Sequence, residues 1–266
     1  MRNLLRGLVS RHALFIALCL LLLGGFEFLI CGLVATVDVS GILKEVTKAA
    51  PALLQGLLTE QVFYGMTTRG ILAFGWNHPM ALALGAAVAI VLAARAVAGE
   101  IENGTMELLL SQPIARQSYL FAHILFALLC LAVLSCFGAL GTYLGQKYYG
   151  LALFESRPLR QLALNFFLLN AAWYGVALVL SVFARESGRV TGAAFLLALL
   201  SYVVQMLGKM WPAAGLLLPY SIYNYYAPAE ILIQEASTAK ALAVLGSVLV
   251  CSLGFSLWRF QRRDIP

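Results

Sequence analysis

The sequence predicts an all-α integral membrane protein with six transmembrane helices. Hydrophobic residues make up 62% of the 266 residues and charged residues only 11%, whereas a soluble domain carries about 25% charged residues. The mean hydropathy is +0.88, and the apolar residues form six runs long enough to cross a bilayer. We therefore expect one transmembrane domain that covers residues 1–266.

The first span is expected at residues 13–35, after a short segment that carries Arg2, Arg6 and Arg11. A cleaved signal peptide is the alternative, but its apolar region has about 7–15 residues and ends at small residues. This apolar run is longer and lacks such a site. Because basic residues before a span favour a cytoplasmic start, we predict that the chain begins in the cytoplasm.

The segment of residues 36–77 mixes charged and apolar side chains. Its apolar residues recur at helical spacing, as at Ile42, Val46, Leu53 and Leu57, with charged residues between them. This pattern predicts amphipathic helices that lie on the outer surface of the membrane.

Five further apolar runs complete the predicted domain, at residues 80–97, 119–144, 162–183, 190–210 and 238–257. Lys and Arg are denser in the connections on the side of the amino terminus than on the other side, which is the pattern of cytoplasmic loops. The sequence therefore predicts a multi-pass protein with both termini in the cytoplasm.

Composition and spacing also exclude several classes of site. The net charge of +6 encodes topology in such a protein, and no basic patch interleaved with aromatic residues indicates a nucleic-acid partner. All five cysteines lie inside apolar runs without metal-ligand spacing, which is typical of small buried hydrophobic residues and not of disulfides or metal sites. We expect no catalytic residues and no bound metal.

The connection between the second and third spans carries three carboxylates and its own short helix. Asn103-Gly104 predicts a helix stop, because glycine tolerates the left-handed backbone that ends a helix. Thr105 is suited to cap a new helix, and Glu107 in its first turn complements the helix dipole. Pro113 ends this helix, which is therefore about two turns and roughly 12 Å long.

Two faces are predicted for this short helix. Met106, Leu109 and Leu110 fall on one face at positions i, i+3 and i+4, while Glu107 and Ser111 fall on another. A short amphipathic helix that crosses a membrane surface has the shape of a docking element.

Residues 100–116 resemble the cytoplasmic loop of permease subunits of ATP-binding-cassette (ABC) exporters of the type-2 permease family. The shared pattern is a glutamate followed by Gly-Thr-x-Glu-Leu-Leu-Leu-Ser-x-Pro-Ile-x-Arg. The Pro- and Tyr-rich segment before the last span and residues 260–265 are also similar to this family. The resemblance implies the type-2 exporter permease fold, with a cytoplasmic coupling helix between spans two and three. It also implies these docking residues for an ATPase: Glu100, Gly104, Thr105, Glu107, Leu109, Pro113 and Arg116.

The same resemblance implies partners and a location. Two copies of a separate ATP-binding subunit would hold ATP and Mg²⁺ and hydrolyse the ATP, so that this chain is not an enzyme and binds no cofactor. A second permease copy, identical or a close paralogue, would complete the assembly in the lipid bilayer. The location implied is the cytoplasmic membrane of a prokaryote, with spans one, two and five along the substrate path.

Glu27 is an ionisable residue within the first span. Such a residue is costly in lipid and indicates a functional or paired role, here in the translocation path. The alternative is a hydrated position near the outer interface. An ion-coupled secondary carrier that uses Glu27, and a non-transporting assembly or maturation factor, are the rival functions.

Three glycines of the third span, Gly138, Gly141 and Gly145, fall on one helix face. The spacing from Gly141 to Gly145 is the small-xxx-small pattern of close helix crossings. This stretch is not a phosphate-binding loop, because Gly-Lys-Ser/Thr is absent from the chain. We therefore predict close helix packing at these glycines.

Overall fold

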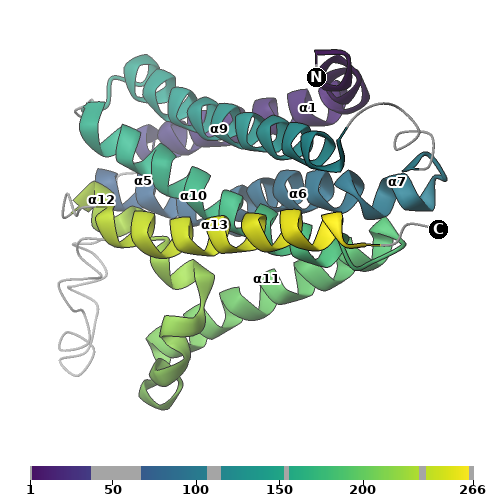
Figure 1. Ribbon diagram of the computed structural model, residues 1–266. Helices are drawn as coiled ribbons and strands as arrows, with labels where there is room; N and C mark the ends of the chain where they lie inside the picture. Colours follow the sequence, from purple (N-terminus) through teal and green to yellow (C-terminus); the bar gives the residue numbers. More distant parts are fainter. Residues whose placement is uncertain (1, 37–66, 107–114, 153–155, 234–237, 264–266) are drawn as a thin grey trace.

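The computed structural model describes residues 2–36, 67–106, 115–152, 156–233 and 238–263, and the described residues are helical or in turns, with no strand among them (Figure 1). Six helical segments are long and apolar enough to cross a membrane, which confirms the predicted fold class. Their bounds are Arg6–Thr36, Thr68–Ala96, Arg116–Tyr148, Ser156–Ser181, Ser187–Met210 and Ala239–Gln261. In order, these segments are α1 (Arg2–Thr36 in full), α5 and α6 together, α9, α10, α11 and α13. The last four helices have the bounds just given.

The second span is longer than the sequence pattern predicts. It joins α5 (Thr68–Asn77) to α6 (Pro79–Ala96), whereas the prediction placed residues 68–77 in an amphipathic segment on the outer surface. In the structure, α5 buries Leu72 and Trp76 in the bundle. The two helices are separated because proline at the first position of α6 disfavours a helical residue before it. Residues 37–66 of the predicted amphipathic segment lie outside the described residues.

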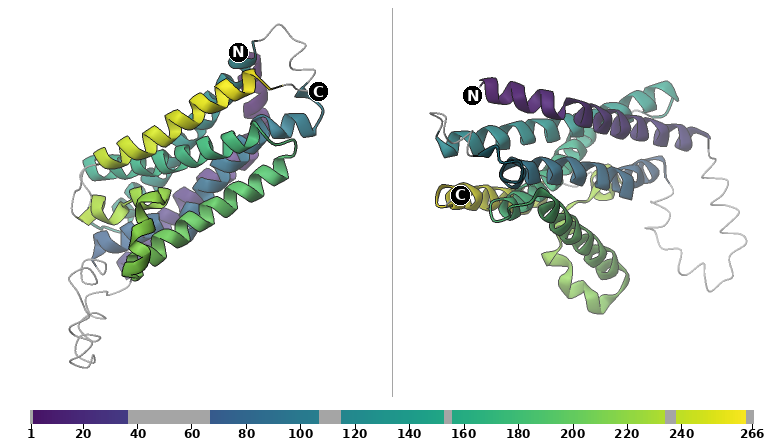
Figure 2. Two further views of the ribbon diagram at one scale, coloured as in Figure 1. Left: turned by 60° about the horizontal axis from the view of Figure 1, so that its bottom comes forward. Right: turned by 90° about the vertical axis from the view of Figure 1, so that its right-hand side faces the viewer.

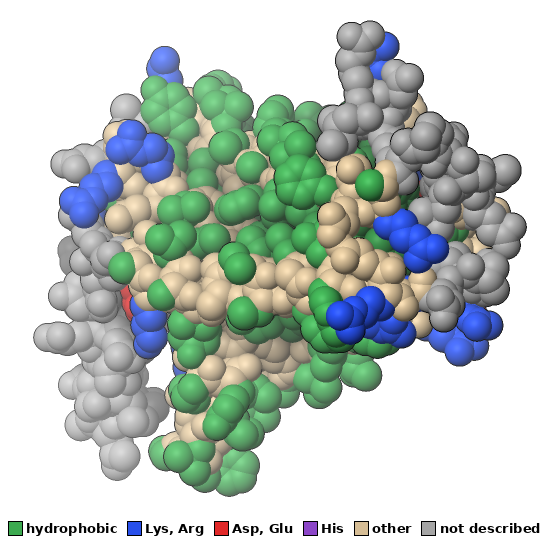
Figure 3. Space-filling view, in the orientation of Figure 1, with side chains coloured by type: hydrophobic (Ala, Val, Ile, Leu, Met, Phe, Trp, Pro, Cys, Tyr) green, Lys and Arg blue, Asp and Glu red, His purple; other side chains and the backbone are tan. Residues whose placement is uncertain are grey.

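The helices run between two distinct ends of the bundle. One end, called the loop end below, holds the first residues of α1, helix α7 (Ala98–Glu102), the start of α9 and the last residues of α13 (Figures 1 and 2). The other end holds α5 and α12 (Pro228–Ile233). Lys and Arg side chains gather at both ends of the face in Figure 3, and hydrophobic side chains cover the middle. This distribution suits a membrane-embedded bundle.

Helix α10 is the centre of the packing. It contacts α6, α9, α11 and α13 and buries the large side chains of Phe166, Trp173 and Tyr174. Helix α1 packs chiefly against α9. Helices α11 and α13 expose long apolar side chains such as Leu199 and Val250, which face lipid or another protein.

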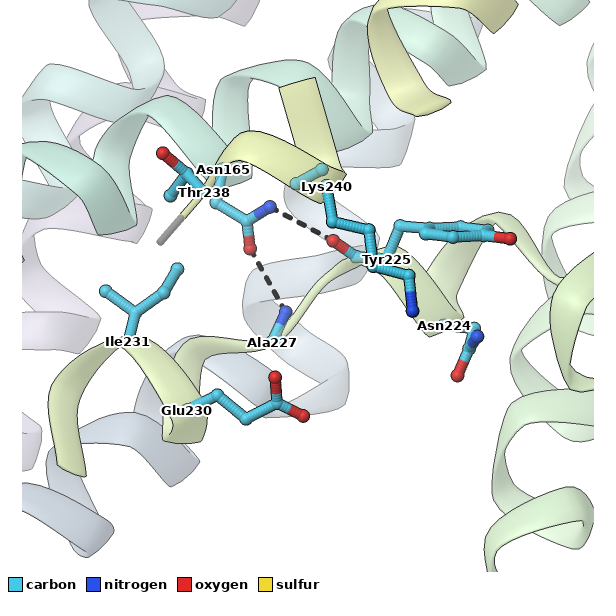
Figure 4. Close-up of a pocket in the computed structure, with 9 residues that line it drawn as sticks. Asn165, Asn224, Tyr225, Ala227, Glu230, Ile231, Thr238 and Lys240 are labelled. Atoms are coloured by element: carbon cyan, nitrogen blue, oxygen red, sulfur yellow. Dashed lines mark hydrogen bonds between the residues drawn. The ribbon is translucent and has the colours of Figure 1, made fainter. Parts of the chain in front are cut away.

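Between α11 and α13 the chain turns back in three short helices. These are η1 (Pro212–Tyr220), η2 (Ile222–Tyr225) and α12. Asn165 of α10 holds the segment in place, because its side-chain amide donates to the carbonyl oxygen of Tyr225 and its amide oxygen accepts from the N–H of Ala227, both at 3.1 Å (Figure 4). Tyr226 donates to the carbonyl oxygen of Trp76 at 2.9 Å, which fixes the segment to α5.

Candidate functional site

The predicted coupling segment, residues 100–116, begins at the loop end of the bundle. Helix α7 ends in a turn in which Asn103 donates from its side-chain amide to the carbonyl oxygen of Gly99 at 2.8 Å. Gly104 has a φ of +67°, the left-handed conformation that the predicted helix stop requires. The described chain resumes at residue 115, and α9 begins at Arg116.

Some of the predicted docking residues lie outside the described part of the chain: Glu107, Leu109 and Pro113. The others do not form one exposed surface. Glu100 and Thr105 contact each other, whereas Arg116 contacts the carboxyl-terminal end of the chain. Met106, which shares the predicted apolar face, is buried in the main hydrophobic cluster.

Glu100 joins the coupling segment to the first span. The residue is only 4% exposed, and its carboxylate forms an ion pair with Arg11 of α1. The hydroxyl of Thr105 donates to the same carboxylate, and the N–H of Thr105 donates to the carbonyl oxygen of Glu100 at 3.0 Å. Of this pair only the Glu100 carboxylate is buried, since the Arg11 side chain is 53% exposed; removal of Arg11 would leave a buried charge without its partner, which is costly. The segment and α1 are therefore strongly connected here.

Glu102 joins α7 to the fifth span. Its carboxylate accepts a hydrogen bond from the hydroxyl of Ser187, the first residue of α11, and another at 2.9 Å from the N–H of the same residue. These two hydrogen bonds lower the pKa of Glu102 below its ordinary value. A carboxylate at this position satisfies an otherwise unpaired N–H and complements the positive end of the α11 dipole.

A second group of contacts lies where α9 begins. Arg116 donates to the carbonyl oxygen of Arg263 at 2.8 Å. The guanidinium of Arg263 is buried and donates to the carbonyl oxygens of Val182 at 2.7 Å and Ala184 at 2.9 Å, which follow the end of α10. Burial lowers the pKa of Arg263. A cation here satisfies carbonyl groups that a helix leaves unpaired at its carboxyl end, so the start of α9 is joined to α10.

Sequence reasoning missed three residues of this network: Arg11, Ser187 and Arg263. Arg11 was read only as a topology signal. A basic residue at the inner end of one span and a glutamate just after another could have indicated the Arg11–Glu100 pair. Arg263 donates to backbone carbonyl groups, which every residue has. The sequence therefore could not predict its acceptors.

A polar pocket of about 400 Å³ opens beside these contacts. Helices α1, α6, α7 and α11 contribute its lining, which includes Arg11, Arg95, Glu100, Glu102, Asn103 and Ser187. The pocket therefore lies among the helices that the two carboxylates connect. Among the described residues, no group of three or more His, Cys, Asp or Glu side chains is placed to hold a metal ion.

Glu27 lies in a different part of the molecule, buried between α1, α5 and α9. It is fully buried, and the hydroxyl of Thr142 donates to its Oε2 atom at 3.4 Å. Trp76 donates in turn to that hydroxyl oxygen at 3.1 Å. The Oε1 atom has no hydrogen-bond partner among the described residues. This burial does not fit the alternative of a hydrated carboxylate at the interface.

The Glu27 contacts predict different outcomes for two substitutions. Glu27→Gln keeps an acceptor for Thr142 and should leave the free energy of unfolding within about 0.5 kcal/mol of wild type. Glu27→Met removes the acceptor and should lower that free energy by about 1–3 kcal/mol, the cost of a lost buried hydrogen bond. Denaturant titration in detergent measures both values. Equal stability of the two variants would show that the hydrogen bond is unimportant, and loss of transport in a stable Glu27→Gln protein would assign the carboxyl group to the substrate path.

The three glycines of α9 lie where α9 crosses its neighbours. A Cβ atom added at Gly141 would lie 2.1 Å from the carbonyl oxygen of Gly24 in α1. One added at Gly138 would lie 2.8 Å from the Trp76 ring, and one at Gly145 would lie 2.7 Å from the nearest atom of α1. Such distances leave no space for a side chain. The glycine face thus sets the separation of α1 and α9 within one chain.

The chain matches the model of one protein family over nearly its whole length. The chain matches the family model described as "ABC-2 family transporter protein" over residues 11–265. This match extends from Arg11 in α1, through the coupling segment, past Arg263. No curated protein matches the chain. Because the family model covers nearly the whole sequence and the fold provides six long apolar helices, the chain belongs to the ABC-2 family of transporter proteins and is an ABC transporter membrane permease.

Proposed function

We propose that this permease is the membrane subunit of an exporter and that residues 107–114 dock onto an ATP-binding subunit. ABC-2 permeases pair with ATP-binding subunits. In the proposed assembly, two permease chains bind two copies of that subunit, which holds ATP and Mg²⁺. The docked segments lie in the cytoplasm, as do both termini. Family membership favours this function over an ion-coupled carrier or a maturation factor.

One observation carries the proposal: the chain is held to the membrane helices on both sides of residues 107–114. Before this segment, Glu100 contacts α1 through Arg11, and Glu102 contacts α11 through Ser187. After it, Arg116 contacts the backbone of Arg263. A force applied between these contacts would reach the first and fifth spans directly. Spans one, two and five are therefore the proposed walls of the substrate path.

The proposed mechanism follows from these connections. ATP binding draws the two ATP-binding subunits together, and each carries its docked coupling segment with it. Movement of the segment pulls on α1 and α11 through two carboxylates. The helices then change from one packed arrangement to another. Packed helices switch between discrete arrangements more readily than they deform continuously.

Leu109→Asp tests the docking. A leucine buried in a partner groove contributes about 1.5–3 kcal/mol, so its replacement by aspartate should weaken binding of the ATP-binding subunit at least ten- to hundredfold. The permease should remain inserted and folded. The measurements are co-purification with the ATP-binding subunit, stimulated ATP hydrolysis, and the melting temperature of the permease in detergent.

Ser111→Asp is the matched control, because it adds the same charge on the other predicted face of the helix. It should leave binding near the wild-type value. Normal co-purification and hydrolysis with Leu109→Asp would exclude the docking role. A collapse of the melting temperature would show instead that Leu109 packs against the bundle, as Met106 does.

A further inference from the structure

Among the described residues, the polar pocket beside the coupling segment contains one guanidinium without an ion-pair partner, that of Arg95. Glu100 is paired with Arg11, and Glu102 accepts two hydrogen bonds from Ser187. Arg95, in the last turn of α6, also lines the pocket and is exposed. Within the described residues, it has no ion-pair or hydrogen-bond partner. Its guanidinium carries five N–H donors that can bind an incoming anion.

We propose that this pocket receives an acidic side chain of the ATP-binding subunit, whose carboxylate pairs with Arg95. The inference rests on the proposed function and adds a second contact to it. A planar guanidinium binds a carboxylate through two parallel hydrogen bonds. A pocket of about 400 Å³ accommodates the side chain that carries this group.

The position of the pocket favours a protein partner over a lipid. Its wall includes Glu102 and Asn103, which precede the proposed docking segment by a few residues. A subunit that docks there would come within reach of the pocket. The carboxylate of Glu102 is also exposed, so the pocket presents one charge of each sign, which a protein surface with an acidic and a basic residue matches better than an anionic headgroup does. Such paired opposite charges provide specificity at protein interfaces.

The contact would also place the partner against the coupling network. The Glu100 carboxylate lines the same pocket and is in contact with Arg11 of α1. Ser187, at the start of α11, lines it as well. An acidic side chain on Arg95 would therefore bring the ATP-binding subunit next to both of the helices that the coupling segment contacts.

Charge substitutions at Arg95 test the inference in the complex of permease and co-expressed ATP-binding subunit. Arg95→Gln should weaken association about tenfold, which corresponds to about 1.4 kcal/mol, and Arg95→Glu should weaken it further. Salt should weaken the wild-type complex more than the Arg95→Gln complex. Arg189→Glu is the matched control at the same end of the bundle, because Arg189 is exposed and pairs with Glu186. Its association should be near the wild-type value, and the melting temperatures of all variants are measured to exclude misfolding.

A photo-crosslinking residue at position 103 identifies the occupant of the pocket. A cross-linked peptide of the ATP-binding subunit that contains Asp or Glu is the expected result. A lipid adduct, or no adduct, would overturn the inference, as would wild-type association of a folded Arg95→Glu permease. If Leu109→Asp detaches the subunit while Arg95→Glu does not, only this inference fails. If neither variant affects association, the proposed function fails as well.

Discussion

A Gly141→Val permease is expected to have a free energy of unfolding lower than wild type by about 3 kcal/mol or more. The Cβ atom alone would lie 2.1 Å from the carbonyl oxygen of Gly24 and 2.9 Å from its Cα atom. Both are backbone atoms of a helix, so no rotamer change relieves the overlap. Helices α1 and α9 must separate along their contact, which also breaks the bond between Thr142 and Glu27.

Gly25→Val is the matched control for this prediction. Gly25 lies next to Gly24 in α1, but a Cβ atom added there meets nothing within 4 Å. Replacement at this position should change the free energy of unfolding by less than about 1 kcal/mol. Denaturant titration of the purified proteins in one detergent gives both values. Equal stability of the Gly141→Val and Gly25→Val proteins would show that this crossing does not hold α1 and α9 together.

The glycine spacing illustrates how far the sequence determines the fold. The small-xxx-small pattern predicted a close helix crossing, but the pattern belongs to one helix and does not identify its partner. The partner surface of Gly24 in α1 became apparent only in the structure. All six predicted spans end within about four residues of the helix ends in the structure, because hydropathy depends on local sequence. The predicted second span starts at residue 80, whereas the structure adds α5 before it, because the prediction groups residues 68–77 with the mixed charged and apolar segment that precedes them.

The coupling segment also combines a feature that the sequence predicts with a contact that it does not. The turn at Gly104 was predicted correctly, because the requirement for a left-handed residue is local. The resemblance selected Glu100 as a docking residue, but its burial assigns it an internal contact. Arg11 and Glu100 are 89 residues apart in the sequence, and no periodic pattern relates two such positions. The coupling motif does not indicate this ion pair; the opposite charges at the ends of two spans are the only signal for it, and the helix packing brings them together.

Reversal of the charge at Glu100 should destabilise the permease and uncouple it. Glu100→Arg places a second guanidinium beside Arg11 at a position that is only 4% exposed, and an uncompensated buried charge costs about 3–5 kcal/mol. Glu100→Gln should cost less, because the amide oxygen still accepts from Thr105. In both variants ATP hydrolysis by the bound subunit should continue, while its stimulation by substrate is lost, because the segment no longer pulls on α1.

The double variant in which the two charges are exchanged, Arg11→Glu with Glu100→Arg, distinguishes the effect of the ion pair from the effects of the two single substitutions. It restores opposite charges at the same two positions, so it should be more stable than the Glu100→Arg protein. A double-mutant cycle on unfolding free energies should give a coupling energy of about 2 kcal/mol. The same cycle on substrate-stimulated ATP hydrolysis should show partial rescue. Strictly additive effects on stability, with no rescue of stimulation, would mean that Glu100 and Arg11 act independently and that the coupling segment moves α1 by another route.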